Sequence, residues 1–418
     1  MTVSAPQSVA GTPFARTPDD SAEGRLLRAY VALGEGRGRE ALEMAASLVN
    51  DHPNFALAQL LYADLLATRA GWPAAFGVDA DAKADTQDAR RRALRLEAQR
   101  RIAAFTEQPP AGQVPAEFVR LAPSIKHAIA VDTTRSRLYL FSHGSQGLRL
   151  ERDFYVSLGK QGVGKYTEGD RRTPLGVYWI SAALPKHQLD ARFGHGALRF
   201  NYPNAEDKLQ GRTGSGLFLH GVPAEVLNHE PWATDGCVAM SNADIEQLLR
   251  TLDVSATPVV ITQNLRWVSP EALRQAAAEF EPAWRAWSQA RRDAAPEAAA
   301  FWYLPGAPEA RRWQPELDEQ RQLSLLSWQG EGESRPLMIV TSHAQPSGRS
   351  PEAVTYRQYW TRQDQRWRIA FEGSVAPATD ATGRSGARLA AAGEAGDSAV
   401  PAAVTAQPAA LRSPLKPR

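Results

Sequence analysis

Cysteine is nearly absent from this chain: a single one, Cys237, stands among 418 residues. One cysteine cannot form an internal disulfide or a multi-cysteine zinc site, so it is either a small buried side chain or a reactive group. No apolar run reaches the ~18–20 residues of a membrane-spanning helix. The 48 basic and 46 acidic side chains leave a net charge of only +2, which gives no electrostatic reason to expect nucleic acid as a partner.

The two ends of the chain lack hydrophobic periodicity. Residues 1–20 are rich in Pro, Ser and Ala and are expected to be a disordered lead-in. They contain no basic segment followed by an apolar one, so no secretory signal is visible. Residues 375–418 are rich in Ala, Gly and Pro and are expected to be a disordered tail. Between these ends, 43% hydrophobic residues and this length allow two or three domains.

The first folded region is expected to be helical and to span residues 21–107. Apolar residues recur at three- and four-residue spacing over residues 22–70, with breaks at 34–38 and 51–54. This pattern resembles about one and a half tetratricopeptide repeats, and an ordinary helical hairpin fits it equally well. Either unit would serve contacts, including contacts with a protein partner. Residues 81–105 predict a charged helix whose arginine-rich face is solvated, and residues 108–125 are interpreted as a linker.

Two further domains follow from a change of period. Residues 126–264 alternate with period two and predict a β-rich domain, with one helix capped by Ser241 and Asp244. Residues 268–374 predict a helix over 270–292, with Phe280, Trp284 and Trp287 on one face, followed by strands. A helix followed by a curved antiparallel sheet resembles the NTF2-like fold. The expected fold class is therefore multidomain α+β: a helical region that resembles tetratricopeptide repeats, a β-rich domain and a C-terminal α+β domain.

Cys237 and His220 stand where thiol chemistry would need them. An unassisted thiol is only a few per cent ionised at neutral pH, and a nearby imidazole can take its proton. His220 ends a predicted strand, and Cys237 follows a glycine-containing turn that can aim the amides of Gly236 and Cys237 at an oxyanion. Taken singly, a lone cysteine or histidine is more often structural. Their joint pattern, followed by a capped helix, favours chemistry.

Two other readings of the sequence are weaker. The run Gly159-x-x-x-x-Gly164-Lys165 matches the start of a phosphate-binding loop, but Tyr166 stands where Ser or Thr should hold magnesium. His220 and His229 are nine residues apart, which is no recognised metal-ligand spacing. We therefore expect neither a nucleotide nor a metal, and no organic cofactor. His229 is interpreted as a loop residue near the mouth of the site.

The motifs around Cys237 resemble the L,D-transpeptidases, the family with a YkuD-type catalytic domain. The resemblance covers roughly residues 126–264 and rests on three runs. These are His220-Gly221 with Thr234-x-Gly236-Cys237-Val238; Gly169-Asp170-x-x-Thr173-Pro174-x-Gly176-x-Tyr178; and Asn201-Tyr202-Pro203-Asn204.

The resemblance implies cysteine acyl transfer on peptidoglycan stem peptides. Cys237 would be the nucleophile, His220 the general base and then acid, and the Gly221 carbonyl the group that orients the imidazole. An amine that takes the thioester would give a cross-link, and water would make the reaction an L,D-carboxypeptidation. A non-catalytic adaptor of the cell envelope is the alternative of another class. Such a substrate implies work in the periplasm.

Two positions depart from the family's usual motif. Many members have His where this chain has Asp235, and many have a substrate-holding Arg where it has Ala239. Both changes occur in a branch that resembles helical cell-shape proteases and carries an NTF2-like C-terminal domain. Substrate contacts would then come from the turn residues or from another basic side chain; the candidates are Thr234, Asp235, Lys165, Arg171, Arg172 and Arg212.

Overall fold

The N-terminal part of the protein is built from four helices. The computed structural model describes residues 19–71, 86–254, 256–293, 301–305, 307, 317–330, 336–346 and 354–375. The helices are α1 (Ala22–Gly34), α2 (Gly38–Asp51), α3 (Ala56–Arg69) and α4 (Thr86–Thr106). Ser21 caps α1, because its hydroxyl accepts a hydrogen bond from the Gly24 amide. Small and aliphatic side chains of all four helices form one buried cluster, so the predicted helical region is confirmed.

The catalytic-domain candidate is an eight-stranded mixed sheet. Its strand order is β10-β8-β7-β6-β11-β2-β3-β4, with parallel pairing for β10–β8 and β11–β2. The bounds are β2 (His127–Asp132), β3 (Arg137–Gly144), β4 (Gly147–Tyr155), β6 (Gly176–Pro185), β7 (Gly196–Phe200), β8 (Phe218–His220), β10 (Val238–Ala239) and β11 (Pro258–Thr262).

Short elements complete this part of the chain. The predicted helix α6 begins after Ser241, whose hydroxyl accepts from the Asp244 amide. Its apolar stripe, with Ile245 and Leu248, is buried against the sheet. The others are β1 (Val114–Pro115), β5 (Leu158–Gly159), β9 (Trp232–Thr234), β12 (Trp267–Val268), α5 (Ala205–Leu209), α6 (Asn242–Thr251), η1 (Lys186–Gln188) and η2 (Ala191–Phe193).

The stretch expected to be a linker is largely buried. Val114 and Pro115 pair with β12, and Phe118 is 1% exposed in the central core. Leu121 and Ile125 belong to the same core cluster. The Pro and Gly residues at 109–112 indicated a break in the chain but gave no sign of the apolar contacts that follow.

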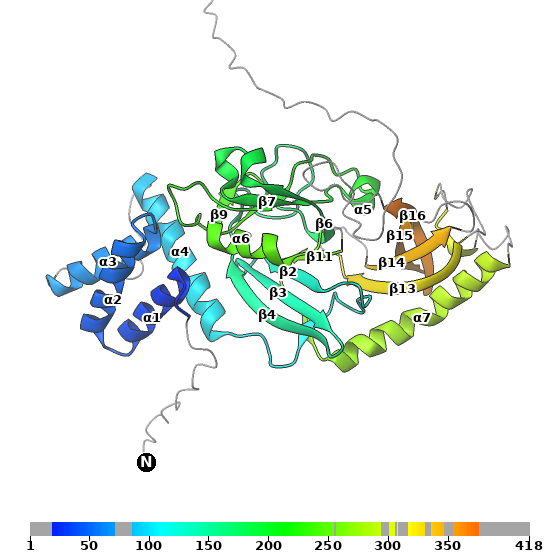
Figure 1. Cartoon of the computed structure of the whole chain (residues 1–418), viewed down its shortest axis with the longest axis horizontal. Helices are drawn as coiled ribbons and strands as arrows, with labels where there is room; N and C mark the ends of the chain where they lie inside the picture. Colours follow the sequence, from blue (N-terminus) through cyan, green and yellow to red (C-terminus); the bar gives the residue numbers. More distant parts are fainter. Residues whose placement is uncertain are drawn as a thin grey trace, which may run out of the picture. The chain divides into compact units, whose positions relative to one another are not determined.

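The C-terminal part is a helix packed on a four-stranded antiparallel meander (Figure 1). Alternate side chains of the meander serve two cores: Ile339 faces the core of the large sheet, whereas Met338 and Val340 pack with α7. The elements are α7 (Pro270–Arg292), β13 (Leu317–Trp328), β14 (Leu337–Pro346), β15 (Val354–Gln363) and β16 (Arg366–Val375). The α+β architecture is confirmed, while the NTF2-like assignment stays a prediction. The expected lead-in and tail lie almost entirely outside the described residues.

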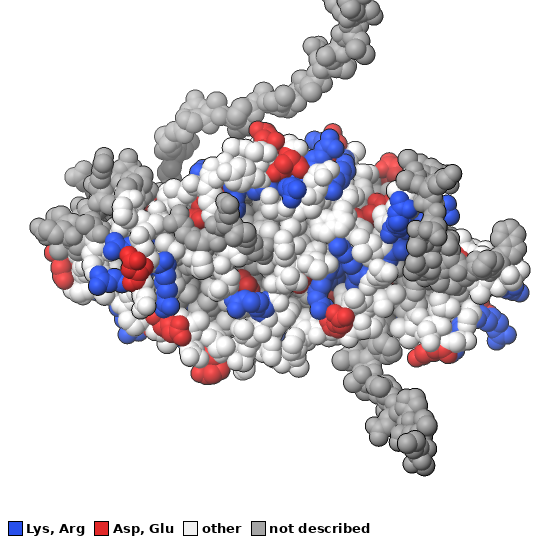
Figure 2. All heavy atoms as spheres, turned by 180° about the vertical axis from the view of Figure 1, so that it is seen from behind, with Lys and Arg blue, Asp and Glu red and all other residues white. Residues whose placement is uncertain are grey.

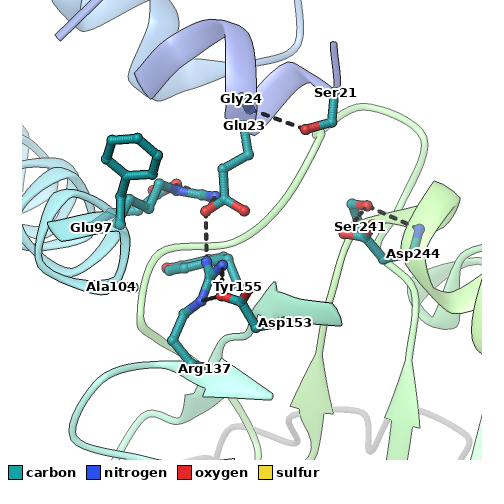
Figure 3. Close-up of polar contacts among 12 residues, drawn as sticks. Ser21, Glu23, Gly24, Glu97, Ala104, Arg137, Asp153, Tyr155, Ser241 and Asp244 are labelled. Carbon is teal, nitrogen blue, oxygen red and sulfur yellow. Dashed lines mark hydrogen bonds and ion pairs between the residues drawn. The ribbon is translucent and has the colours of Figure 1, made fainter. Parts of the chain in front are cut away.

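A buried ionic cluster joins the first helices to the large sheet (Figure 3). Glu23 of α1 accepts hydrogen bonds from Arg101 of α4 and Arg137 of β3, both at 2.7 Å. Arg137 also donates to Asp153 of β4 at 2.9 Å. Burial would raise the pKa of Glu23, but the two guanidinium groups hold that pKa below its usual range. Because a buried charge is costly without a partner, this cluster specifies how α1 and α4 dock on the sheet.

Candidate active site

The pairing of β8 with β10 brings the two predicted catalytic residues together. The strands are parallel, with Val238 opposite Leu219 and Ala239 opposite His220. Cys237 directly precedes β10, so continuing the register places it beside Phe218, two positions before the partner of His220. Because side chains alternate between the faces of a sheet, Cys237 and His220 emerge on the same face of adjacent strands. Residues separated by 17 positions in the sequence become diagonal neighbours in this way.

His220 is held in one orientation from two sides. Its Nδ1 lies 2.5 Å from the Gly221 carbonyl oxygen, so Nδ1 carries the hydrogen and donates, which leaves Nε2 to accept a proton. Phe193 packs edge-on against the ring, with centroids 5.0 Å apart. Burial lowers the pKa of His220 to about 4, although the Gly221 hydrogen bond opposes this shift. The imidazole is therefore neutral at physiological pH, the form that a general base requires.

Cys237 is a partly buried thiol rather than a ready thiolate. Its Sγ lies 3.9 Å from the Gly216 carbonyl oxygen. Burial raises the pKa of the Cys237 thiol to about 11, and the Phe218 amide and the charge of Arg192 counteract part of that rise. With His220 also neutral, the resting pair is thiol and imidazole, and the thiol proton must move when the sulfur attacks.

The turn before Cys237 is fastened by Thr234. The Thr234 hydroxyl donates to the Cys237 carbonyl oxygen at 2.6 Å and accepts from the Gly236 amide at 3.2 Å. Gly236 has φ 120, and a Cβ added there would lie 2.8 Å from the Arg172 carbonyl oxygen. Only glycine fits this position without strain. Of the two predicted oxyanion donors, the Gly236 amide is thus shared with Thr234, which is a positioning residue of the turn.

Asn242 is a site residue that the sequence analysis missed. Its Oδ1 accepts hydrogen bonds from the amides of His195 and Val222, and its Nδ2 donates to the Val222 carbonyl oxygen at 2.8 Å. A Cβ at Gly221 would lie 2.2 Å from that Oδ1. Asn242 therefore fixes the backbone just after His220, and the glycine is needed for its close approach. An Asn directly after a helix cap was the only local signal.

The predicted basic substrate contacts are mostly engaged elsewhere. Lys165 is buried and pairs with Asp170 at 2.8 Å. Arg212 pairs with Asp207 at 2.9 Å. The remaining candidates are exposed: Arg171 lies 3.8 Å from Asp235, which also pairs with Lys160 at 3.2 Å, and Arg172 donates to the Val163 carbonyl oxygen at 3.0 Å.

Arg192 is the cation that acts on both reactive groups. It lies exposed in η2, beside Phe193, and its charge lowers the pKa values of both Cys237 and His220. No motif marked it, because the contact depends on how η2 packs beside β8. Ala239, the position of Arg in many members of the family that the motifs resemble, is 1% exposed and lies opposite His220. On the face shown in Figure 2, basic and acidic side chains are interspersed rather than gathered by sign.

The structure also bears on the two weaker readings. Residues 159–165 form part of β5 and a turn, and no helix follows Lys165, as a phosphate-binding loop would need. Within the described ranges, no group of three or more His, Cys, Asp or Glu side chains is arranged to hold a metal ion. His229 is half-buried on the segment between His220 and β9, and its charge contributes to lowering the pKa of His220. None of the described helices is long and apolar enough to cross a membrane.

The part of the chain that contains this site is similar to known proteins. Residues 126–261 match the family profile of the L,D-transpeptidase catalytic domain, YkuD. YafK of Escherichia coli K12, named as a candidate L,D-transpeptidase, is 29% identical over 115 residues. That match covers 23% of this chain and 41% of YafK, so it spans about two fifths of the relative's length.

Solved structures are similar over a longer part of the chain. Bd1075 of Bdellovibrio bacteriovorus has a TM-score of 0.50 at 20% identity and covers 63% of this chain and 98% of its own. At this identity the likeness shows a shared fold. The helical cell shape determining protein Pgp2 of Campylobacter jejuni has a TM-score of 0.49 at 17% identity, and covers 62% and 95%.

We expect the thiol of the substrate-free protein to behave as a neutral group. With a pKa near 11, the rate of Cys237 alkylation by iodoacetamide rises about tenfold per pH unit from about pH 6 to pH 9, because the thiolate fraction does so. Mass spectrometry of samples quenched at set times measures this rate, because Cys237 is the single cysteine of the chain. A plateau at neutral pH would instead show a preformed thiolate–imidazolium pair.

Proposed function

We propose, from the premise that residues 126–261 match an L,D-transpeptidase catalytic domain, that this protein transfers acyl groups of peptidoglycan stem peptides through Cys237. The observation that carries the proposal is the placement of His220 and Cys237 on one face of adjacent strands, with His220 oriented by the Gly221 carbonyl. A histidine with a fixed tautomer beside a thiol is the arrangement that nucleophilic catalysis requires.

The chemistry follows from the neutral resting pair. The Cys237 sulfur attacks the carbonyl carbon of the L-centre residue at the third position of the stem, and its proton passes to Nε2 of His220. The carbonyl oxygen becomes an oxyanion near the Cys237 amide and the shared Gly236 amide. As the C–N bond breaks, imidazolium returns the proton to the leaving D-alanine amine. An amine or water then attacks the thioester, His220 accepts the proton of that nucleophile, and the proton passes to the Cys237 sulfur as the C–S bond breaks.

Arg192 is our candidate for the substrate carboxylate. The Arg of many relatives is replaced by the buried Ala239, and Lys165 and Arg212 are paired with Asp170 and Asp207. Arg192 lies beside the ring that packs on His220, its one ion pair among the described residues is an exposed 3.9 Å approach to Asp190, and its charge reaches both reactive groups. A guanidinium binds a carboxylate with two hydrogen bonds, so it suits the terminal carboxylate of the leaving D-alanine.

A hydrolytic outcome is the second candidate. Asp235, where many relatives have His, is exposed and paired with Lys160, and Ala239 adds no donor to the site. A site with fewer groups to hold an acceptor amine favours water as the acceptor. The product would then be a tripeptide stem, as in an L,D-carboxypeptidase. Either reaction places the protein's work in the periplasm, which cell fractionation tests.

The first experiment follows the fate of a disaccharide-tetrapeptide. We expect release of D-alanine and a transient adduct on wild-type protein, seen by intact-mass analysis, and neither with Cys237→Ala. The ratio of tripeptide to cross-linked dimer separates hydrolysis from transpeptidation. Wild-type protein that yields neither D-alanine nor adduct contradicts the proposal and favours the envelope adaptor.

Removal of the base should slow acylation strongly. We expect His220→Ala to lower the rate of adduct formation by about 10²–10⁴-fold, the usual effect of losing general-base help. Rapid-quench mass analysis of Cys237 measures the rate. The exposed His187→Ala serves as the matched control and should act as wild type. A loss below about tenfold would assign the base to another group, with His229 the first to test.

Loss of Arg192 should weaken substrate binding more than it slows chemistry. For Arg192→Ala we expect KM to rise about tenfold and kcat to change less than about twofold, since a charged hydrogen bond to a carboxylate contributes about 1.5–3 kcal/mol. Steady-state D-alanine release measures both constants. Arg39→Ala, at an exposed position of α2, is the control. An unchanged KM would assign the carboxylate to a different residue.

A further inference from the structure

One segment of the chain links the two reactive residues. Residues 222–231 run from His220-Gly221 to β9, and β9 leads directly into the turn that carries Cys237. At its start, Val222 is bound through both backbone groups to Asn242. At its end, the Pro231 carbonyl accepts from the Leu158 amide at 2.9 Å. The middle of the segment is held by the N-terminal helices.

The turn between α2 and α3 makes the first set of contacts. The Leu227 amide donates to the Asn54 carbonyl oxygen at 3.1 Å, and the Asn54 side chain donates to the Ala224 carbonyl oxygen at 3.2 Å. The Leu227 side chain packs into the apolar cluster of the helices. A residue of the catalytic part thus completes the core of the helical region.

Helix α4 makes the second set. The Asn228 amide lies so that its nitrogen donates to Glu97 at 3.2 Å and its oxygen accepts from Arg101 at 2.6 Å. Arg101 is 2% exposed and also bonds Glu23 in the buried ionic cluster. Arg100 directly precedes Arg101 on α4, and its guanidinium lies 4.7 Å from the centre of the Trp232 ring.

The segment held by these contacts is joined to the turn before Cys237 through β9 and the hydrogen bonds of Thr234. Trp232 is the first residue of β9 and pairs with Leu158. Two residues later, Thr234 bonds both Gly236 and the Cys237 carbonyl. The contacts of Asn54, Arg100 and Arg101 with residues 222–232 are called the clamp below. A cavity of about 350 Å³, lined in part by Leu227 and Asn228, adjoins it. The segment therefore has space to shift when the contacts are removed.

We infer that the N-terminal helical region is a positioning element of the active site: Asn54, Arg100 and Arg101 hold residues 222–232 and so fix the turn whose amides meet the oxyanion. The inference rests on the proposed use of Cys237 as an acyl-transfer nucleophile. It assigns the helices a part in the reaction itself. A misplacement of about 1 Å can cost about 10²-fold in rate, so a weak clamp has a measurable effect.

Two reagents separate positioning of the turn from integrity of the thiol. Acylation by p-nitrophenyl acetate forms an S–C bond, passes through an oxyanion and breaks the C–O bond to release p-nitrophenolate, while the thiol proton goes to His220. Alkylation by iodoacetamide forms an S–C bond and expels iodide without any oxyanion. Only the first reaction uses the turn amides. Neither needs a stem peptide, so a failure of the proposed substrate does not affect this test.

The decisive variant is Asn54→Ala combined with Leu227→Ala in the full chain. We expect its rate constant for acylation of Cys237 to fall about tenfold, with alkylation within about twofold of wild type. Hydrogen exchange of residues 222–231 should rise in parallel. The matched control is Asn50→Ala with Leu66→Ala, two exposed positions of α2 and α3 that should leave all three readouts unchanged. A second double variant, Asn54→Ala with Leu227→Met, retains the packing at position 227. Its acylation of Cys237 should be restored.

Three outcomes overturn the inference, and a fourth contradicts only the proposed substrate. Unchanged acylation despite faster exchange shows that the turn is held without the helices. Equal losses of acylation and alkylation show local unfolding rather than positioning. Wild-type protein whose Cys237 is acylated no faster than a free thiol shows that the turn stabilises no oxyanion. Normal acylation by the ester together with no reaction on the tetrapeptide contradicts the proposed substrate and leaves the positioning role in place.

Discussion

The parallel pairing of β8 with β10 is the constraint on which the rest of the site depends. A two-residue strand would be marginally stable alone. Val238 of β10 is fully buried and pairs with Leu219, and Ala239 exchanges two backbone hydrogen bonds with Ser157 on the other side of the strand. This register sets Cys237 and His220 on the same face. A shift by one residue would place the thiol on the opposite face of the sheet. The burial of Val238 and Leu219 therefore specifies the geometry of the Cys237–His220 pair.

Burial then sets the protonation of that pair. The same desolvation that raises the pKa of Cys237 lowers that of His220, because each charged form loses water. The resting Cys237–His220 pair is uncharged, and in the proposed reaction charge develops on the pair only when a carbonyl group arrives. Such a site has low reactivity toward adventitious electrophiles and depends on well-placed donors. This dependence is the physical reason why the rigidity of the Thr234–Cys237 turn matters, and why its support from the helices is of interest.

The N-terminal helices and the large sheet are connected by charge as well as by apolar contacts. Glu23 shares its carboxylate between Arg101 and Arg137, and each of these has a further acidic partner. A buried charge with several hydrogen bonds allows little change in geometry, because a displacement that leaves the charge unpaired costs free energy. The cluster thereby gives α4 a defined position, from which Arg100 and Arg101 reach residues 228–232. The region first interpreted as a platform for partners also acts within the chain.

The sequence by itself determined the local structure and indicated Cys237 and His220 as the candidate reactive pair. Helical and alternating periodicities predicted α1, α2, α3 and α7 and most strands, because each element buries one face of its own. The Thr234-x-Gly236-Cys237 run and His220-Gly221 indicated thiol chemistry, since the turn needs its glycine. Tertiary structure alone decided the rest. Asn242, Arg192 and Phe193 join the site, and Lys165 and Arg212 are drawn into ion pairs, through contacts between residues far apart in the chain. A single sequence carries no signal for such contacts, because they depend on how the strands and loops are packed and not on local spacing.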